Sequence, residues 1–188
     1  SDFIHSDDIH PIDIVETVAT HHEWDFDRLA EDQIAMAVEG QWRTYSITLA
    51  WSPRDEVLRL ICTFDMDPPR DRLPQLYEVL NLANDQVWDG GFTFWAPQKL
   101  MVWRYGLVLS GDAMASPEQI DRMIGNAIMA SERFHPCFQL ACWGDASPEA
   151  AMICSLRTSG PNSAEILPRL MTMIRWATLR HSPTSDVE

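Results

Sequence analysis

The sequence predicts an α/β fold of the α+β kind, an antiparallel five-stranded sheet with helices packed on it, in the order α-β-β-β-α-β-β-α. Three observations predict it. Segments of alternating apolar and polar residues recur between residues 33 and 110, short turns join them, and one helical segment interrupts them. Strands joined by short turns pair as a meander, and their apolar face is buried under helices.

The elements before the inserted helix follow from periodicity. A helix is expected over residues 11–22, because Pro11 suits a first helical turn and apolar residues follow at helical spacing. Trp24 and Phe26 are expected to lead into a turn. Three strands follow, with core-facing residues Ile34, Met36 and Val38, then Tyr45, Ile47, Leu49 and Trp51, then Leu58, Leu60, Cys62 and Phe64.

The middle of the chain carries the inserted helix and two further strands. Apolar residues three or four apart predict a helix over about residues 71–87, with Pro74 tolerated in its first turn. Gly90 and Gly91 free the backbone for a turn. Alternating segments at 92–96 and 101–109 are the fourth and fifth predicted strands.

The remaining chain is predicted to be helical. Ser116, Pro117 and Gln119 form a capping-box pattern, and the helix that follows is expected to kink or end near residue 132 because of Pro136. Another helix should start at Ser147.

A linker at 160–163 is predicted to precede a last helix over 164–180, which carries Arg169, Arg175 and Arg180. The predicted domains are therefore residues 1–159 and a helical extension, 160–188.

Length and charge exclude several classes of function. A chain of 188 residues predicts one main domain. A net charge of −14 argues against nucleic-acid binding, because a phosphate backbone repels an acidic surface. No apolar run reaches the roughly 20 residues that cross a bilayer, and residues 1–10 contain three Asp and no Lys or Arg, unlike a secretory signal. We expect a cytoplasmic protein that does not bind membranes.

No motif for catalysis, metal or cofactor stands out. His21 and His22 are adjacent and point about 100° apart on a helix, and His135, Cys137 and Cys142 lack the paired spacing of a zinc site. The four cysteines lie in apolar stretches and are expected to be buried thiols. We therefore expect no catalytic, cofactor-binding or metal-binding residues.

Two adjoining segments carry a family resemblance. Residues 81–88, Asn-Leu-Ala-Asn-Asp-Gln-Val-Trp, followed by Gly-Phe-Thr-Phe-Trp at 91–95, resemble the helix-to-strand junction of the bacterial YbjN family, which is described as sensory transduction regulators. Residues 11–15 and 132–136 are also similar, and the resemblance covers about residues 8–157. It implies a fold similar to type III secretion chaperones, which are acidic cytoplasmic homodimers that bind extended segments of client proteins.

Together these features predict a non-enzymatic regulatory or chaperone-like protein, a homodimer that binds a protein segment over exposed aromatic side chains or along a sheet edge. Trp42, Trp88 and Trp95 are the predicted contact residues. The rival hypothesis is an enzyme or small-ligand binder with a pocket between helix 71–87 and the sheet. Its polar groups would be Asp85, Arg104 and His135.

Overall fold

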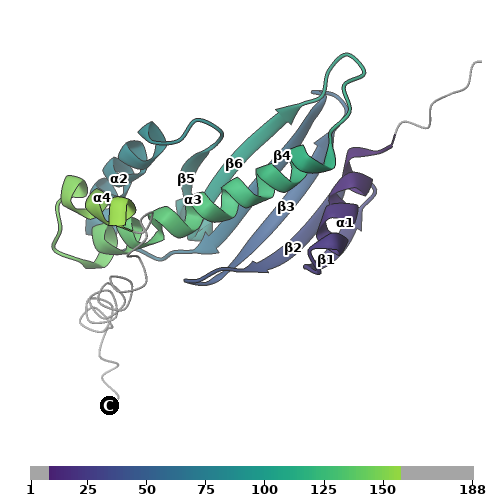
Figure 1. The fold of residues 1–188 in the computed structure, drawn as a ribbon. Helices are drawn as coiled ribbons and strands as arrows, with labels where there is room; N and C mark the ends of the chain where they lie inside the picture. Colours follow the sequence, from purple (N-terminus) through teal and green to yellow (C-terminus); the bar gives the residue numbers. More distant parts are fainter. Residues whose placement is uncertain (1–8, 158–188) are drawn as a thin grey trace, which may run out of the picture.

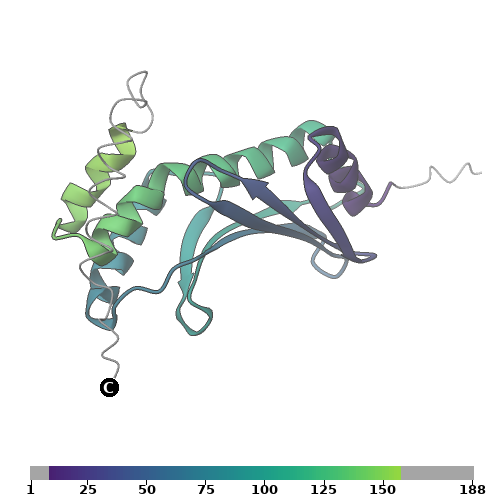
Figure 2. The ribbon, with the colours of Figure 1, turned by 90° about the horizontal axis from the view of Figure 1, so that it is seen from below.

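A six-stranded antiparallel sheet, covered by helices on one face, forms the body of the protein in the computed structural model, which describes residues 9–157 (Figures 1 and 2). The strands lie in the order β1-β2-β3-β4-β6-β5. Their bounds are β1 Asp25–Ala30, β2 Gln33–Glu39, β3 Thr44–Ser52, β4 Val57–Asp65, β5 Gly91–Trp95 and β6 Leu100–Val108.

The sheet has six strands, so the predicted count of five is wrong. The additional strand is β1, in the segment where a turn was expected, and it pairs with β2 at the sheet edge. Its side chains are exposed or only half-buried, so it lacks the apolar alternation of a strand with a buried face. Arg28 of β1 forms ion pairs with Asp13 and Glu16, which attaches the strand to the helix before it.

The described residues form four α-helices and two short 3-10 turns. The helices are α1 Pro11–His21, α2 Leu73–Asp85, α3 Pro117–Trp143 and α4 Pro148–Arg157, and the turns are η1 Arg70–Arg72 and η2 Ala96–Gln98. The capping box at Ser116 and Gln119 is confirmed. No helix among the described residues combines the length and the apolar character needed to cross a membrane.

The long helix α3 does not end near residue 132. It continues through Pro136 to Trp143, and Phe134, Cys137 and Phe138 around the proline are fully buried. A proline inside a helix costs about 3 kcal/mol. Burial of these neighbours against α2 and α4 offsets that cost, because each large apolar side chain contributes about 1.5–3 kcal/mol when it is buried.

Figure 2 shows α3 crossing one face of the sheet, and the buried apolar residues lie between this face and the helices. All four cysteines are buried thiols, as predicted. Burial raises the pKa of Cys62, Cys137 and Cys142 to about 12 in each case, so these side chains behave as small apolar groups. The predicted helix over 164–180 and the predicted domain boundary after residue 159 lie outside the described residues.

The helix α2 is fastened to the strand β5 by one side chain. The Asn84 side chain donates from Nδ2 to the carbonyl oxygen of Phe92 at 3.0 Å and accepts from the Phe92 N–H at 2.7 Å. Both Phe92 backbone groups on the outer side of β5 are thereby satisfied, as a neighbouring strand would satisfy them. Both partners of this contact lie in residues 81–95, the segment that carried the family resemblance. The contact explains in physical terms why this segment has a defined structure.

Candidate functional site

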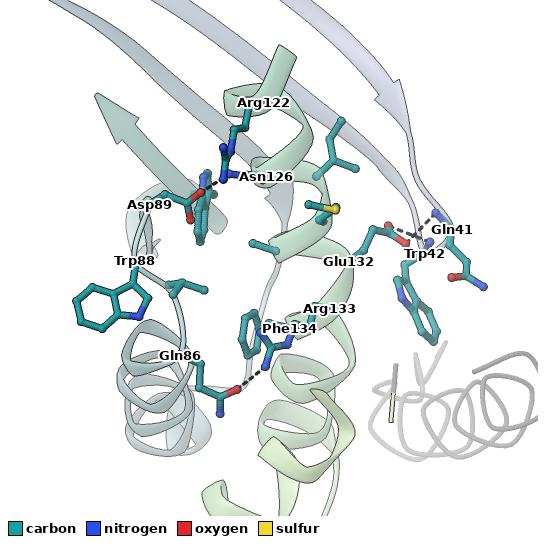
Figure 3. A pocket seen from close by; sticks show the side chains of 15 residues that line it. Gln41, Trp42, Gln86, Trp88, Asp89, Arg122, Asn126, Glu132, Arg133 and Phe134 are labelled. Atoms are coloured by element: carbon teal, nitrogen blue, oxygen red, sulfur yellow. Dashed lines mark hydrogen bonds between the residues drawn. The ribbon is translucent and has the colours of Figure 1, made fainter. Parts of the chain in front are cut away.

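A hollow of about 790 Å³ lies along α3 (Figure 3). Its lining comes from four places: the helix α3, the connection between α2 and β5, the turn between β2 and β3, and one residue of β6. The side chains are Gln41, Trp42, Gln86, Val87, Trp88, Asp89, Trp103, Arg122, Asn126, Ile128, Met129, Ala130, Glu132, Arg133 and Phe134.

The connection between α2 and β5 is attached to α3 on both sides of Trp88. Arg133 donates from Nη2 to Oε1 of Gln86 at 2.6 Å, and Asn126 donates to the Asp89 carboxylate. Trp88 stands between these two contacts with 99% of its surface exposed (Figure 3). The result is a large apolar ring held in solvent by a backbone that is fixed at both ends.

Apolar and cationic side chains of α3 line the same hollow as Trp88. Met129 is 63% exposed. The Arg133 guanidinium lies 4.7 Å from the centre of the Phe134 ring, and Arg122 is exposed one turn before Asn126. A ring, a thioether and guanidinium groups on one surface can bind an apolar side chain together with nearby oxygen acceptors.

The turn between β2 and β3 is held on α3 by Glu132. Its carboxylate accepts hydrogen bonds from the Tyr45 hydroxyl at 2.6 Å, from the Gln41 N–H at 3.0 Å and from the Trp42 N–H at 3.3 Å. Burial, and next this hydrogen bond, raise the pKa of Tyr45 well above its ordinary value. Glu132 therefore positions Trp42 beside α3.

His135 lies beneath the same region and is buried. Its ring centre is 5.9 Å from that of Trp42 and 5.4 Å from that of Phe64, and its Nδ1 atom has no hydrogen-bond partner within the described structure. Burial, followed by the nearby Arg43 charge, lowers the pKa of His135 to about 3. The imidazole is therefore neutral at physiological pH and belongs to the core packing.

Two of the three predicted contact residues line the hollow. Trp42 and Trp88 lie on opposite sides of α3 (Figure 3). Trp95 does not line it: it is a half-buried residue at the end of β5, and alternation places it on the sheet face opposite to buried Phe92. The three tryptophans therefore do not form one surface.

The three polar residues of the rival hypothesis are not brought together. His135 is on α3, which covers one sheet face, whereas exposed Arg104 alternates with buried Trp103 and points to the other face. Asp85 is exposed at the end of α2. None of the three lines the hollow along α3.

Several residues of this site were not predicted as such. Gln86, Asp89, Asn126, Glu132 and Arg133 position the two tryptophan-bearing segments through contacts between residues 37 to 91 positions apart. Gln86, Glu132 and Arg133 lie in segments 81–88 and 132–136, which carried the family resemblance, so the resemblance could have pointed to these three residues. No group of three or more His, Cys, Asp or Glu side chains within residues 9–157 is arranged to hold a metal ion.

A smaller hollow of about 290 Å³ adjoins the first. It shares Asp89, Arg122 and Asn126 with it, and its floor is formed by Tyr105 and Leu107 of β6. Both floor residues are half-buried.

Comparison with known proteins agrees with the resemblance. The family model YbjN, described as "Putative bacterial sensory transduction regulator", matches residues 11–140. This range runs from the start of α1 into the last turn of α3, and it contains both hollows. No curated protein matches this chain.

Proposed function

This chain belongs to the YbjN family, and from that premise we propose that it is a non-enzymatic regulatory protein that binds a segment of another protein along α3. The observation that carries the proposal is Trp88, which is 99% exposed although the side chains of Gln86 and Asp89, on either side of it, are hydrogen-bonded to α3. The family description, a sensory transduction regulator, supports a regulatory role.

The energetics of Trp88 favour a contact role. Burying a Trp side chain removes about 150–250 Å² of surface from water, which is favourable when a partner covers the ring. Because the connection is already fixed by Gln86 and Asp89, little conformational entropy is lost when a partner binds. Tryptophan is also among the residues that carry most binding energy at protein interfaces.

The chemistry of the surface specifies the kind of segment. Trp88 and Met129 can contact an apolar side chain of the segment, and Arg122 can donate hydrogen bonds to a carboxylate or carbonyl oxygen of the neighbouring residue. In this proposal the protein acts like a secretion chaperone, as a cytoplasmic homodimer that holds an extended partner segment without chemical change.

A small-molecule ligand is the second candidate. A hollow of about 790 Å³ has the size of many ligand pockets, which are about 300–1,000 Å³. The partner segment is favoured because Trp88 projects into solvent instead of enclosing the hollow, and because the rival polar residues Asp85, Arg104 and His135 lie outside it.

Site-specific photo-crosslinking in the native host tests the proposal. A photoreactive phenylalanine replaces Trp88 in one variant and Tyr77, an exposed ring on α2, in the control. We expect one partner protein to be cross-linked at position 88 and not at position 77.

The identified partner is then titrated against purified proteins. Trp88→Ala should weaken binding at least about tenfold, whereas Tyr77→Ala should leave it unchanged. Thermal unfolding should be the same for both variants, since exposed side chains contribute little to stability. No cross-linked protein at position 88, or equal binding by Trp88→Ala, would show the proposal to be wrong.

A further inference from the structure

Part of the strand β6 has an unpaired edge. β4 pairs with all nine residues of β6, but β5 pairs only with Leu100–Arg104. The outer side of the next four residues, Tyr105–Val108, is therefore not paired with any strand of the described chain.

The other exposed edges of the sheet are protected. β1 carries Asp25, Asp27 and Arg28, and charges on an edge strand discourage further pairing. The outer side of β5 is occupied at Phe92 by Asn84. The β6 edge, Tyr-Gly-Leu-Val, contains no charge and no proline, and Val108 is 62% exposed. An edge of this kind is a template for another strand.

The hydrogen bonds between Asn84 and Phe92 show in which direction the backbone N–H and C=O groups of each β6 residue point. Because Phe92 bonds Asn84 on its outer side, the Phe92–Trp103 pair exchanges no backbone hydrogen bonds, and the neighbouring pair Gly91–Arg104 does. Alternation then directs the N–H and C=O groups of Gly106 and Val108 outward. These four groups are available to an added strand.

We propose that a second copy of this chain pairs with Tyr105–Val108 in antiparallel fashion, around a two-fold axis at Leu107. Gly106 of each copy then lies opposite Val108 of the other, and the two Leu107 residues face each other in a pair without backbone hydrogen bonds. The two sheets become one continuous sheet. The inference rests on the homodimer within the proposed function, and it does not depend on the hollow at Trp88.

A copy of the same chain fits this edge for steric reasons. Gly106 has no side chain and leaves room for Val108 of the other copy, while Tyr105 and Leu107, half-buried under the 290 Å³ hollow, gain apolar neighbours.

Charge also favours a second copy. Two chains of net charge −14 repel each other, but this edge brings no charged residue of one copy opposite a charged residue of the other. Exposed Arg104 precedes the edge and exposed Asp112 follows it, so antiparallel pairing places the Arg104 end of each copy beside the Asp112 end of the other. A positive and a negative residue therefore lie near each end of the paired strands.

Sedimentation velocity over a range of protein concentrations tests the inference. We expect the wild-type chain to form dimers and Val108→Glu to raise the dimer dissociation constant at least about tenfold, because each copy places a carboxylate in the uncharged strand pair. The matched control is Leu29→Glu, at a residue 58% exposed on β1 at the opposite edge, which should leave dimerisation unchanged. Circular dichroism verifies that both variants fold.

Disulfide cross-linking tests the register. Opposed residues of a non-hydrogen-bonded pair lie about 4.5 Å apart at Cα, within the range of a disulfide. Leu107→Cys should therefore give a covalent dimer under mild oxidation, whereas Val108→Cys should give little, since Val108 faces Gly106.

A monomeric wild-type chain, or a dimer unaffected by Val108→Glu with no cross-link at position 107, would overturn the inference. Partner binding that still depends on Trp88 would then leave the proposed function intact. Conversely, a Leu107 cross-link without any partner at position 88 would support the dimer and count against the proposed function.

Discussion

The carboxylate of Glu132 accepts a hydrogen bond of 2.6 Å from the Tyr45 hydroxyl, and this contact joins α3 to the sheet beside the candidate site. The same carboxylate also accepts the backbone N–H groups of Gln41 and Trp42. One side chain therefore connects a core residue, a turn and a tryptophan that lines the hollow.

We expect Glu132→Gln to destabilise the protein by about 1–3 kcal/mol, because a charged acceptor with three donors is replaced by a neutral amide. Urea unfolding measures the loss. The control is Glu78→Gln, at an exposed residue of α2, which should change stability by less than about 0.5 kcal/mol. Equal effects of the two substitutions would contradict the role of Glu132.

Glycine is required at position 40 for the same reason. A Cβ atom there would overlap Oε1 of Glu132 and the ring of Tyr45, neither of which can move without losing their hydrogen bond. Gly40→Ala should therefore lower the melting temperature. Gly125→Ala, in α3, meets no atom within 4 Å and should instead stabilise the helix by about 1 kcal/mol. Calorimetry of the two variants should give shifts of opposite sign.

Asn84→Ala should expose the outer backbone groups of β5. Both the N–H and the C=O of Phe92 lose their partner, which we expect to cost about 1–3 kcal/mol. Hydrogen exchange of the Phe92 amide should become faster than in the wild type. Asn81→Ala, one turn earlier on the exposed side of α2, is the control and should leave this amide protected.

Acid should destabilise the protein through His135. Its pKa is about 3 when folded and 6.5 ordinarily, so below pH 6.5 the unfolded chain binds a proton that the folded chain does not. Stability present above pH 6.5 is therefore lost as the pH falls toward 3, on the order of 2 kcal/mol between pH 7 and 5.

Urea unfolding at pH 7 and pH 5 tests this. Between these two pH values, His135→Leu should lose on the order of 2 kcal/mol less stability than the wild type. The leucine variant also removes the unpartnered Nδ1 atom, so its stability at pH 7 should not fall strongly. Leu76→Val, at a buried residue of α2 that has no titratable group, is the control and should keep the wild-type pH dependence. An unchanged slope in His135→Leu would contradict a buried neutral imidazole.

The sequence predicted the buried elements well and the edge poorly. Strands β2 to β6 and helices α1 to α3 were recognisable because their apolar residues recur at the period of the element. β1 was missed because an edge strand needs little apolar surface, and Phe26 and Arg28 of β1 are only half-buried. The expectation that Pro136 would end α3 early was wrong because tertiary packing of its neighbours outweighs the local cost.

For the site, residue type pointed to Trp42 and Trp88 but could not show what holds them. Glu132 acts on a turn 90 positions earlier, and Asn126 on an aspartate 37 positions earlier. Periodicity relates only residues that are a few positions apart. Contacts between residues so distant in the sequence depend on how α3 crosses the sheet, which periodicity does not predict. Trp95 was separated from the others for the same reason: its strand presents it to the opposite face.

The inaccessible thiols also have a practical consequence. Burial keeps Cys62, Cys137 and Cys142 protonated at neutral pH, and Cys154 is also buried. Maleimide reagents should therefore not react with the native chain. A fluorophore or spin label would then attach only where a surface cysteine is introduced. Distances between two labels on the chain, or across the proposed dimer, could therefore be measured without first deleting any natural residue.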